Sequence, residues 1–302
     1  MEKILSIDVG GTYVKGCLVD KSGNISFQEK IKVAVTYERF LDEIYLFVQD
    51  IKSRNDFNRD GSTLAGVVVA LPGGYDIKND IIFAPNLSLL NEKHIKNDLS
   101  KLLDLPVIIE NDANLAAYGE YIFGEKKKID NMVFCTLGTG FGGGLILNRH
   151  LLQSNITIFE VGHMSIDYNG TMCSCGRKGC VDKYCSVTGL QTIYEKLTGV
   201  KYIKPEELGQ LALHKDNNAL KTFETFGKYL AQAFANLAAL FCPEKIKFGG
   251  GLSELAPYFL EQCREEFEKI VFPAYKGRVI IEQATLKNKA GMLGGAALFF
   301  DL

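Results

Sequence analysis

Short β-branched runs alternate along the chain with longer stretches of helical spacing. Residues 4–9 are mostly Ile, Leu and Val, lead into two glycines, and continue into a second apolar run that ends at Val19. Residues 132–147 repeat this order around a larger group of glycines. An apolar run, a glycine turn and a second apolar run predict a β-hairpin. Because the pattern occurs twice, we predict an internally duplicated chain with one hairpin in each half.

Amphipathic periodicity predicts helices between and after these hairpins. One apolar stripe at helical spacing, which we expect to face the core, consists of Phe40, Leu41, Ile44, Phe47, Val48 and Ile51. A Val- and Ile-rich run at 105–110 changes into an Ala-rich helical pattern at Asn111 and Asp112. Another apolar run ends in three glycines at 249–251, and an amphipathic helix is expected to follow with Ser253 as its N-cap. This mixture predicts an α/β protein.

Length and composition then limit the domain organisation and the partners. At 302 residues the chain exceeds what one compact core usually holds, so two domains are expected, 1–120 and 121–302. A hydrophobic content of 47% with 23% charged residues is typical of a soluble globular protein. The net charge of −2 gives no general attraction to nucleic acid or to an anionic membrane. Small-molecule partners are therefore expected.

The sequence gives no signal for export or membrane anchoring. The N-terminus lacks a cationic start followed by a long apolar region, and the most apolar helical segment, 230–242, is too short and too polar to span a bilayer. Eight cysteines in 302 residues are too few for a disulfide scaffold. A reducing, cytoplasmic location is the expectation.

Three cysteines and one histidine have the spacing of metal ligands. The set is His163, Cys173, Cys175 and Cys180. Thiolate and imidazole are ligands that Zn2+ prefers, and such close spacing can wrap one ion within a short loop. Gly176 and Gly179 provide the positive φ angles that a chain folding around a metal needs. The alternative is that the cysteines are small buried hydrophobic residues. Residue types and spacing favour a zinc site.

The glycine turns of both hairpins are candidate phosphate-binding loops. Glycine lets the main chain approach a ligand closely, so successive backbone N–H groups can surround phosphate oxygens. Thr12 and Thr139 add hydroxyl donors. The spacing Gly138-x-Gly140-x-x-Gly143 also matches a dinucleotide fingerprint, but that fold requires a helix where this sequence predicts a strand. A structural turn is the alternative for either loop alone; two matched loops favour phosphate binding.

Asp112 is the candidate catalytic base. It lies at the N-terminus of a predicted helix, where the helix dipole and backbone N–H groups keep a carboxylate ionised. Such a carboxylate can accept the proton of a substrate hydroxyl that attacks a phosphate. Simple N-capping by Asn111 or Asp112 is the alternative. Beside two candidate phosphate loops, catalysis is the favoured interpretation.

Together these motifs resemble the sugar kinases of the ROK family (repressors, open reading frames and kinases), within the actin-like and hexokinase ATPase fold. The matching segments are similar to the family's two phosphate motifs, its adenosine motif, its catalytic-base motif and its zinc loop: 8–12, 137–140, 249–251, 111–114 and 160–180. The likeness covers nearly the whole chain. It implies a two-domain actin-like (ribonuclease H-like) α/β ATPase fold with an interdomain cleft, a final helix at about 290–302 packed back on the N-terminal domain, and a homodimer.

The resemblance implies that ATP and Mg2+ are bound by the glycine motifs. The residues expected to hold them are Asp8, Gly10, Gly11, Thr12, Gly138, Thr139, Gly140, Gly249 and Gly250. Asp8 would bind Mg2+ through water, and the cation would bridge the phosphates. Lys15, close to the first loop, is interpreted as an exposed strand lysine.

The resemblance also assigns the sugar side. The residues expected to contact a hexose are Gly73, Asn111, Asp112, Glu160, His163 and Asp182. Asp112 would take the proton from the sugar hydroxyl, most often O6. The family usually has Glu at the position of Asp182, contacting the sugar near its anomeric end, and Asp is shorter by one methylene. Zinc, bound by His163 and the three cysteines, would be structural and would fix the loop that presents Glu160 and His163.

The resulting hypothesis is an ATP-dependent hexose kinase. Glucose is the leading substrate, and N-acetylmannosamine, allose and a β-glucoside are alternatives. The same family contains sugar-responsive repressors, which carry an N-terminal helix-turn-helix before the first phosphate motif. Here that motif begins at Asp8, and Asp112 and both loops are present. Catalysis is therefore expected rather than non-catalytic sugar sensing.

Overall fold

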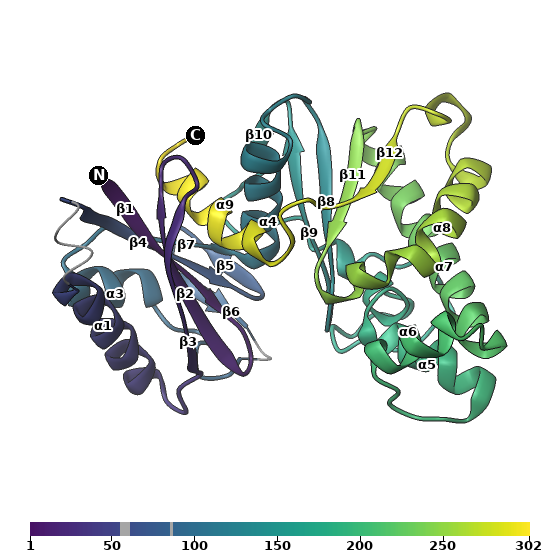
Figure 1. Cartoon of the computed structure of the whole chain (residues 1–302), viewed down its shortest axis with the longest axis horizontal. Coiled ribbons are helices and arrows are strands. Elements are labelled where there is room, and N and C mark those ends of the chain that lie inside the picture. Colours follow the sequence, from purple (N-terminus) through teal and green to yellow (C-terminus); the bar gives the residue numbers. More distant parts are fainter. Residues whose placement is uncertain (55–60, 85–86) are drawn as a thin grey trace. The chain divides into compact units, whose positions relative to one another are not determined.

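Two sheets of matching strand order form the framework of the protein (Figure 1). The computed structural model describes residues 1–54, 61–84 and 87–302. The first five-stranded sheet has the order β3 (Ile25–Lys32), β2 (Tyr13–Asp20), β1 (Glu2–Val9), β4 (Thr63–Leu71) and β7 (Val107–Asn111). The second has the order β10 (His150–Leu151), β9 (Phe141–Leu147), β8 (Met132–Leu137), β11 (Lys245–Gly249) and β12 (Ile280–Gln283).

Strand directions also match between the two sheets. In the first, β1 pairs antiparallel with β2 and parallel with β4, which pairs parallel with β7. In the second, β8 pairs antiparallel with β9 and parallel with β11, which pairs parallel with β12. The two predicted hairpins and the internal duplication are therefore confirmed.

The chain folds into two compact units. The first contains residues 1–127, 151–158 and 289–302, and the second contains residues 128–150 and 159–288. The division expected after residue 120 stays a prediction, and the structure adds two later segments to the first unit. One of them carries the last helix, α9 (Ala290–Phe299), which contacts β1 and β4.

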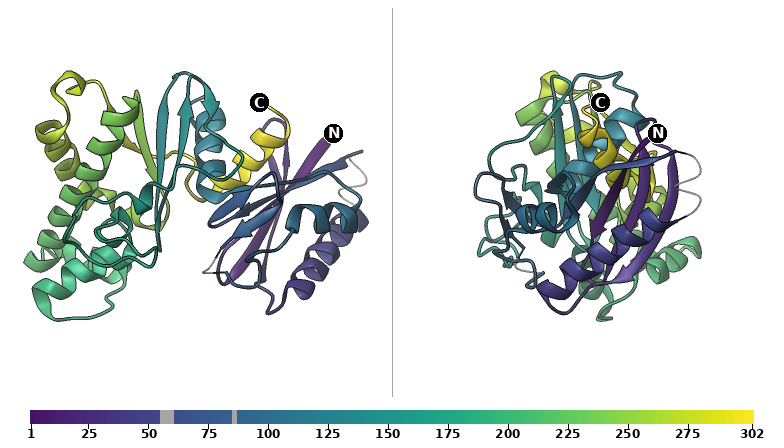
Figure 2. Two further views of the ribbon diagram at one scale, coloured as in Figure 1. Left: turned by 180° about the vertical axis from the view of Figure 1, so that it is seen from behind. Right: turned by 90° about the vertical axis from the view of Figure 1, so that its left-hand side faces the viewer.

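Helices cover both faces of the first sheet (Figures 1 and 2). One face carries α1 (Tyr37–Ser53) and α3 (Ile95–Leu103), and the other carries α4 (Asp112–Gly119) and α9. Successive side chains point to opposite faces of a strand, so Leu5 and Ile7 join the core cluster of α1, whereas Ser6 lies against Gly295 of α9. Five of the six stripe residues predicted for α1 are buried, and Leu41 packs at the edge of the cluster. The predicted stripe is confirmed.

A two-stranded sheet, β5 (Gly74–Asp76) and β6 (Ile81–Phe83), completes the first unit. Residues 151–158 return to pair with it. Thr157 N donates to Tyr75 O at 2.9 Å, and Ile77 N donates to Asn155 O at 2.8 Å. These hydrogen bonds hold residues 151–158 within the first unit.

The helices of the second unit are α5 (Val187–Thr198), α6 (Pro205–Leu213), α7 (Asn217–Phe241) and α8 (Ala256–Ile270). Aromatic side chains pack α7 and α8 on the sheet: the ring of Phe248 in β11 lies 6.4 Å from that of Phe234 and 5.8 Å from that of Phe259. Within the described ranges, no helix is long and apolar enough to cross a membrane.

Short turns complete the secondary structure. The π-helical turn η1 (Glu120–Gly124) follows α4, and the 3-10 turns are η2 (Val161–His163), η3 (Val181–Lys183), η4 (Gly251–Leu255), η5 (Pro273–Tyr275) and η6 (Lys287–Lys289). The predicted N-cap role of Ser253 is wrong. This residue lies inside η4, where its hydroxyl donates to Gly250 O at 2.7 Å, because a 3-10 turn that begins at Gly251 precedes α8.

Candidate functional site

The first glycine loop connects β1 to β2 and presents open backbone. Gly10 N donates to Tyr13 O at 2.9 Å, which closes the turn. A Cβ at Gly11 would meet no atom within 4 Å, so a ligand can approach the main chain there. Asp8 Oδ2 lies 3.6 Å from Lys15 Nζ across the hairpin. Burial raises the pKa of Asp8, and the positive charge of Lys15 offsets part of that rise.

The second glycine loop connects β8 to β9. Gly138 N donates to Gly140 O at 3.0 Å, and Thr139 and Gly140 are exposed. Phe141 N, at the start of β9, donates to Asp182 Oδ1 at 3.0 Å. The carboxylate of Asp182, predicted to contact a sugar, thus lies against this loop.

The third glycine group lies beside the second loop in the same unit. Gly249 pairs with Thr136 of the neighbouring strand β8. Gly250 has φ +87°, and a Cβ there would lie 2.5 Å from Leu137 O, so only glycine fits without a shift. Gly251 is exposed with open space beside it. Bare backbone next to a phosphate-type loop can support a flat nucleoside.

In the first unit, β7 ends and α4 begins at the predicted base. Asn111 is the N-cap, and its Oδ1 accepts hydrogen bonds from Ala113 N at 2.9 Å and Asn114 N at 3.1 Å. Asp112 is the first residue of α4 and is exposed. The capping alternative is therefore correct for Asn111, and the carboxylate of Asp112 lies at the positive end of the helix dipole.

Gly73 lies next to the same junction. Asn111 Nδ2 donates to Gly73 O at 3.0 Å. Gly73 has φ +90°, a conformation that favours glycine. The structure thus brings together Gly73, Asn111 and Asp112, three of the residues predicted on the sugar side.

Glu110 supports this junction and was missed by the sequence reasoning. It is 5% exposed, and its Oε1 accepts hydrogen bonds from Asn111 N at 2.8 Å and Asn114 Nδ2 at 3.0 Å. Its Oε2 accepts a 2.6 Å hydrogen bond from Gln153 Nε2. A carboxylate inside an apolar strand pattern was the available signal, because such a residue is rarely buried without partners.

The four predicted metal ligands converge in the second unit. Their ligand atoms all lie within 4.8 Å of one another. Cys175 Sγ and Cys180 Sγ are 3.6 Å apart, and Cys173 Sγ is 3.7 Å from His163 Nδ1. Two sulfurs bound tetrahedrally at about 2.3 Å from zinc lie about 3.8 Å apart, so the cluster fits a zinc site.

The local backbone also suits a metal, and the thiols of the cluster differ in how readily they ionise. Gly176 and Gly179 have φ +87° and +72°, as predicted from the sequence. Burial raises the pKa of Cys173, but hydrogen bonds from Cys175 and His163 outweigh it and bring the pKa down to about 7. Zinc binds the thiolate, so Cys173 ionises at little cost near neutral pH, whereas burial raises the pKa of Cys180 to about 12.

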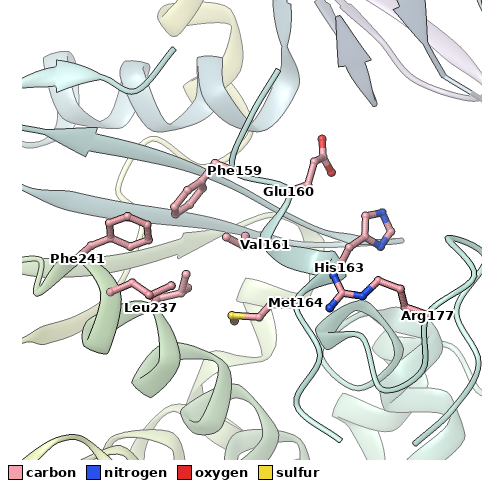
Figure 3. Close-up of a pocket in the computed structure, with 9 residues that line it drawn as sticks. Phe159, Glu160, Val161, His163, Met164, Arg177, Leu237 and Phe241 are labelled. Carbon is pink, nitrogen blue, oxygen red and sulfur yellow. The ribbon is translucent and has the colours of Figure 1, made fainter. Parts of the chain in front are cut away.

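Glu160 and His163 lie at the edge of an open cavity of about 330 Å3. Glu160 is exposed directly before the turn η2, and His163 is half-buried at its end. In Figure 3, Phe159, Leu237 and Phe241 form one side of this cavity, and the polar side chains of Glu160, His163 and Arg177 lie on the other. The segment 160–163, which carries both predicted sugar ligands, thus ends at a residue of the His/Cys cluster.

Comparison with known proteins identifies the family. Residues 4–301, nearly the whole chain, match the sequence model of the ROK family. The chain belongs to the ROK family. The two-unit α/β structure with duplicated sheets matches that of ROK sugar kinases, which have the actin-like fold.

Relatives of this ROK protein include both enzymes and regulators. The xylose repressor of Bacillus subtilis (strain 168) is 30% identical over 304 residues, which cover 98% of this chain and 77% of the repressor. The glucokinase of Halalkalibacterium halodurans is 31% identical over 317 residues, which cover 97% of this chain and 94% of the enzyme. A ROK glucokinase from Streptomyces griseus, solved in complex with glucose and AMPPNP, is 28% identical, with a TM-score of 0.80 and 98% of each chain covered.

Proposed function

We propose that this ROK protein is an ATP-dependent hexose kinase that transfers the γ-phosphate to a sugar hydroxyl, with O6 of glucose as the first candidate. The observation that carries this proposal is the junction of β7 and α4. Asn111 supplies the N-cap of α4, and Asp112 Oδ1 also accepts a hydrogen bond from Ala113 N at 2.8 Å, so the exposed carboxylate of Asp112 is held at the helix N-terminus. A carboxylate at this position can accept the proton of an attacking hydroxyl as a general base.

The glycine motifs support ATP as the phosphate donor. Gly10 N and Gly138 N close the two turns, and the loops would offer the backbone N–H groups of residues 11–12 and 139–140, with the hydroxyls of Thr12 and Thr139, to phosphate oxygens. Gly249 and Gly250 would hold the adenosine. Asp8 supplies an oxygen ligand of the type that Mg2+ prefers, bound directly or through water. Bound Mg2+ would neutralise charge that develops during phosphoryl transfer.

The zinc cluster supports a structural role for the metal. His163 and the three cysteines would fill a tetrahedral coordination shell and leave no position for a reactive water. His163 would then be held by one ring nitrogen, and Glu160 stands three residues before it, directly before the turn η2. We propose that this loop presents Glu160 and His163 to the sugar.

A regulatory function is the second candidate, because a xylose repressor is about as similar to this chain as a glucokinase is. A sugar sensor would bind the sugar without phosphorylating it. Sugar binding without ADP release would therefore favour sensing, whereas turnover would favour the kinase.

The test is ADP release from Mg·ATP with a panel of glucose, mannose, allose, fructose, N-acetylglucosamine, N-acetylmannosamine and cellobiose. Asp112→Asn should lower kcat by at least about 10²-fold, the low end for a positioned base, with sugar affinity nearly unchanged by calorimetry. Asp104→Asn, which changes an exposed carboxylate at the C-cap of α3, is the matched control and should leave kcat unchanged. Equal rates for Asp112→Asn and the wild-type protein would refute the role of Asp112.

A further inference from the structure

Asp182 lies against the second glycine loop. Its Oδ1 accepts the hydrogen bond from Phe141 N at 3.0 Å, and a Cβ added to Gly140 would lie 3.1 Å from the same oxygen. Its Oδ2 lies 3.5 Å from Lys183 Nζ, and the Asp182 side chain is only 19% exposed. Both carboxylate oxygens are therefore engaged within the second unit, at the point where the loop passes into β9.

The backbone that follows Asp182 holds the other end of the loop. The Asp182 carbonyl accepts a hydrogen bond from Ser186 Oγ at 2.6 Å, and Ser186 is fully buried. Val187 N then donates to Gly138 O at 2.9 Å. The loop is itself closed by the bond from Gly138 N to Gly140 O, so this segment contacts it at both ends.

The same segment begins at the zinc cluster. Cys180, which is completely buried, stands two residues before Asp182. Val181 N donates to Met164 O at 2.9 Å, directly after the ligand His163. The 3-10 turn η3 therefore connects the cluster to the loop through a short, hydrogen-bonded stretch of chain.

We propose that Asp182 is a positioning residue that fixes the second glycine loop for nucleotide phosphates, in place of the sugar contact predicted from the sequence. The inference rests on the proposed function, because it takes residues 138–140 as a phosphate loop. Backbone N–H groups bind phosphate well only when the turn already points them toward the position that the phosphate oxygens occupy in the complex. Lys183 offsets the charge that a carboxylate would otherwise place beside the phosphates.

The length of the side chain is part of this proposal. Asp182 reaches Phe141 N while it already touches the space where Gly140 would carry a Cβ. A glutamate would push its carboxylate one methylene further into the loop. We therefore expect Asp182→Glu to disturb the loop and Asp182→Asn, which keeps an acceptor oxygen at the same distance, to preserve it.

The experiment compares Asp182→Ala with Asp182→Asn in the full-length protein. AMPPNP and glucose dissociation constants are measured separately by calorimetry, and hydrogen exchange is followed at the Phe141 amide. Asp182→Ala should raise the dissociation constant of AMPPNP about tenfold, which corresponds to the loss of one charge-assisted hydrogen bond. It should change the dissociation constant of glucose by less than about twofold. Its Phe141 amide should exchange about tenfold faster or more, whereas Asp182→Asn should stay within about threefold of the wild-type protein in all three measurements.

Other outcomes overturn the proposal. Loss of glucose affinity with AMPPNP binding intact would make Asp182 a sugar ligand. A general folding defect would weaken the binding of AMPPNP and glucose equally, and that result would refute the positioning role. An unchanged exchange rate of the Phe141 amide would also refute it. If the wild-type protein binds no AMPPNP, the proposed kinase function fails, and the Phe141 exchange rate still decides whether Asp182 holds the loop.

Discussion

Gly176 and Gly179 are a matched pair for testing how the backbone holds the zinc cluster. Both lie between Cys175 and Cys180 and have positive φ, +87° and +72°. Their surroundings differ: a Cβ at Gly176 would meet nothing within 4 Å, whereas a Cβ at Gly179 would overlap the Asp167 carbonyl oxygen and lie 2.6 Å from its carbonyl carbon. Alanine therefore adds only backbone strain at the first position and strain plus a steric clash at the second.

The expected magnitudes follow from these contacts. Gly176→Ala should lower the free energy of unfolding by about 1–2 kcal/mol, because alanine is strained in the left-handed conformation. For a unit of this size, that loss corresponds to a decrease in Tm of about 2–8 °C. At Gly179 the backbone must also move, which breaks the bonds from Gly179 N to Thr171 O at 2.9 Å and from Ile166 N to Gly179 O at 2.8 Å. With about 0.5–1.5 kcal/mol for each bond, the total for Gly179→Ala is about 2–5 kcal/mol before the clash is counted.

The assay measures zinc content by elemental analysis and zinc affinity by chelator competition, beside thermal unfolding. Cys180 follows Gly179 directly, and metal ligands tolerate displacements of only about 0.2 Å. Gly179→Ala should therefore lose zinc, and Gly176→Ala should retain it. The reasoning is refuted if the two variants have the same zinc affinity and the same Tm.

Three further predictions follow from the described contacts. Asn111→Ala removes the N-cap of α4 and should lower the free energy of unfolding by about 0.5–2 kcal/mol in urea titration; an unchanged midpoint would contradict the capping role. Gly250→Ala forces a Cβ to within 2.5 Å of Leu137 O and should lower Tm, whereas Gly251→Ala, with open space around it, should not; equal Tm values would show that the close approach does not matter. Cys175→Ser should weaken both zinc and sugar binding, with the exposed Cys242→Ser as control, and wild-type sugar affinity in Cys175→Ser would contradict the loop-ordering role of zinc.

Much of the fold could be predicted because its signals are local. Apolar runs on either side of glycines predict the hairpins at 4–19 and 132–147, and apolar residues at helical spacing predict the buried stripe on α1. The zinc cluster was predictable for the same reason, since three of its ligands lie within one short loop. Local spacing also predicted the positive φ of Gly176 and Gly179.

Local patterns were less reliable where neighbouring residues compete for one role. The sequence allowed either Asn111 or Asp112 to cap α4, and only the structure shows Asn111 Oδ1 accepting the bonds from the helix N-terminus. Ser253 has the right residue type for an N-cap, but α8 begins three residues later because the chain first forms a 3-10 turn.

The sequence by itself determined the two hairpins, the glycine loops and the four residues of the His/Cys cluster, because each depends mainly on residues close together in the chain. Only the tertiary structure decided which distant groups meet. Glu110 receives Gln153 from a later segment, and the carboxylate of Asp182 turns to Phe141, far from it in the sequence. Side-chain direction and hydrogen-bond partners across such separations depend on how strands and turns pack, and no local pattern encodes that packing.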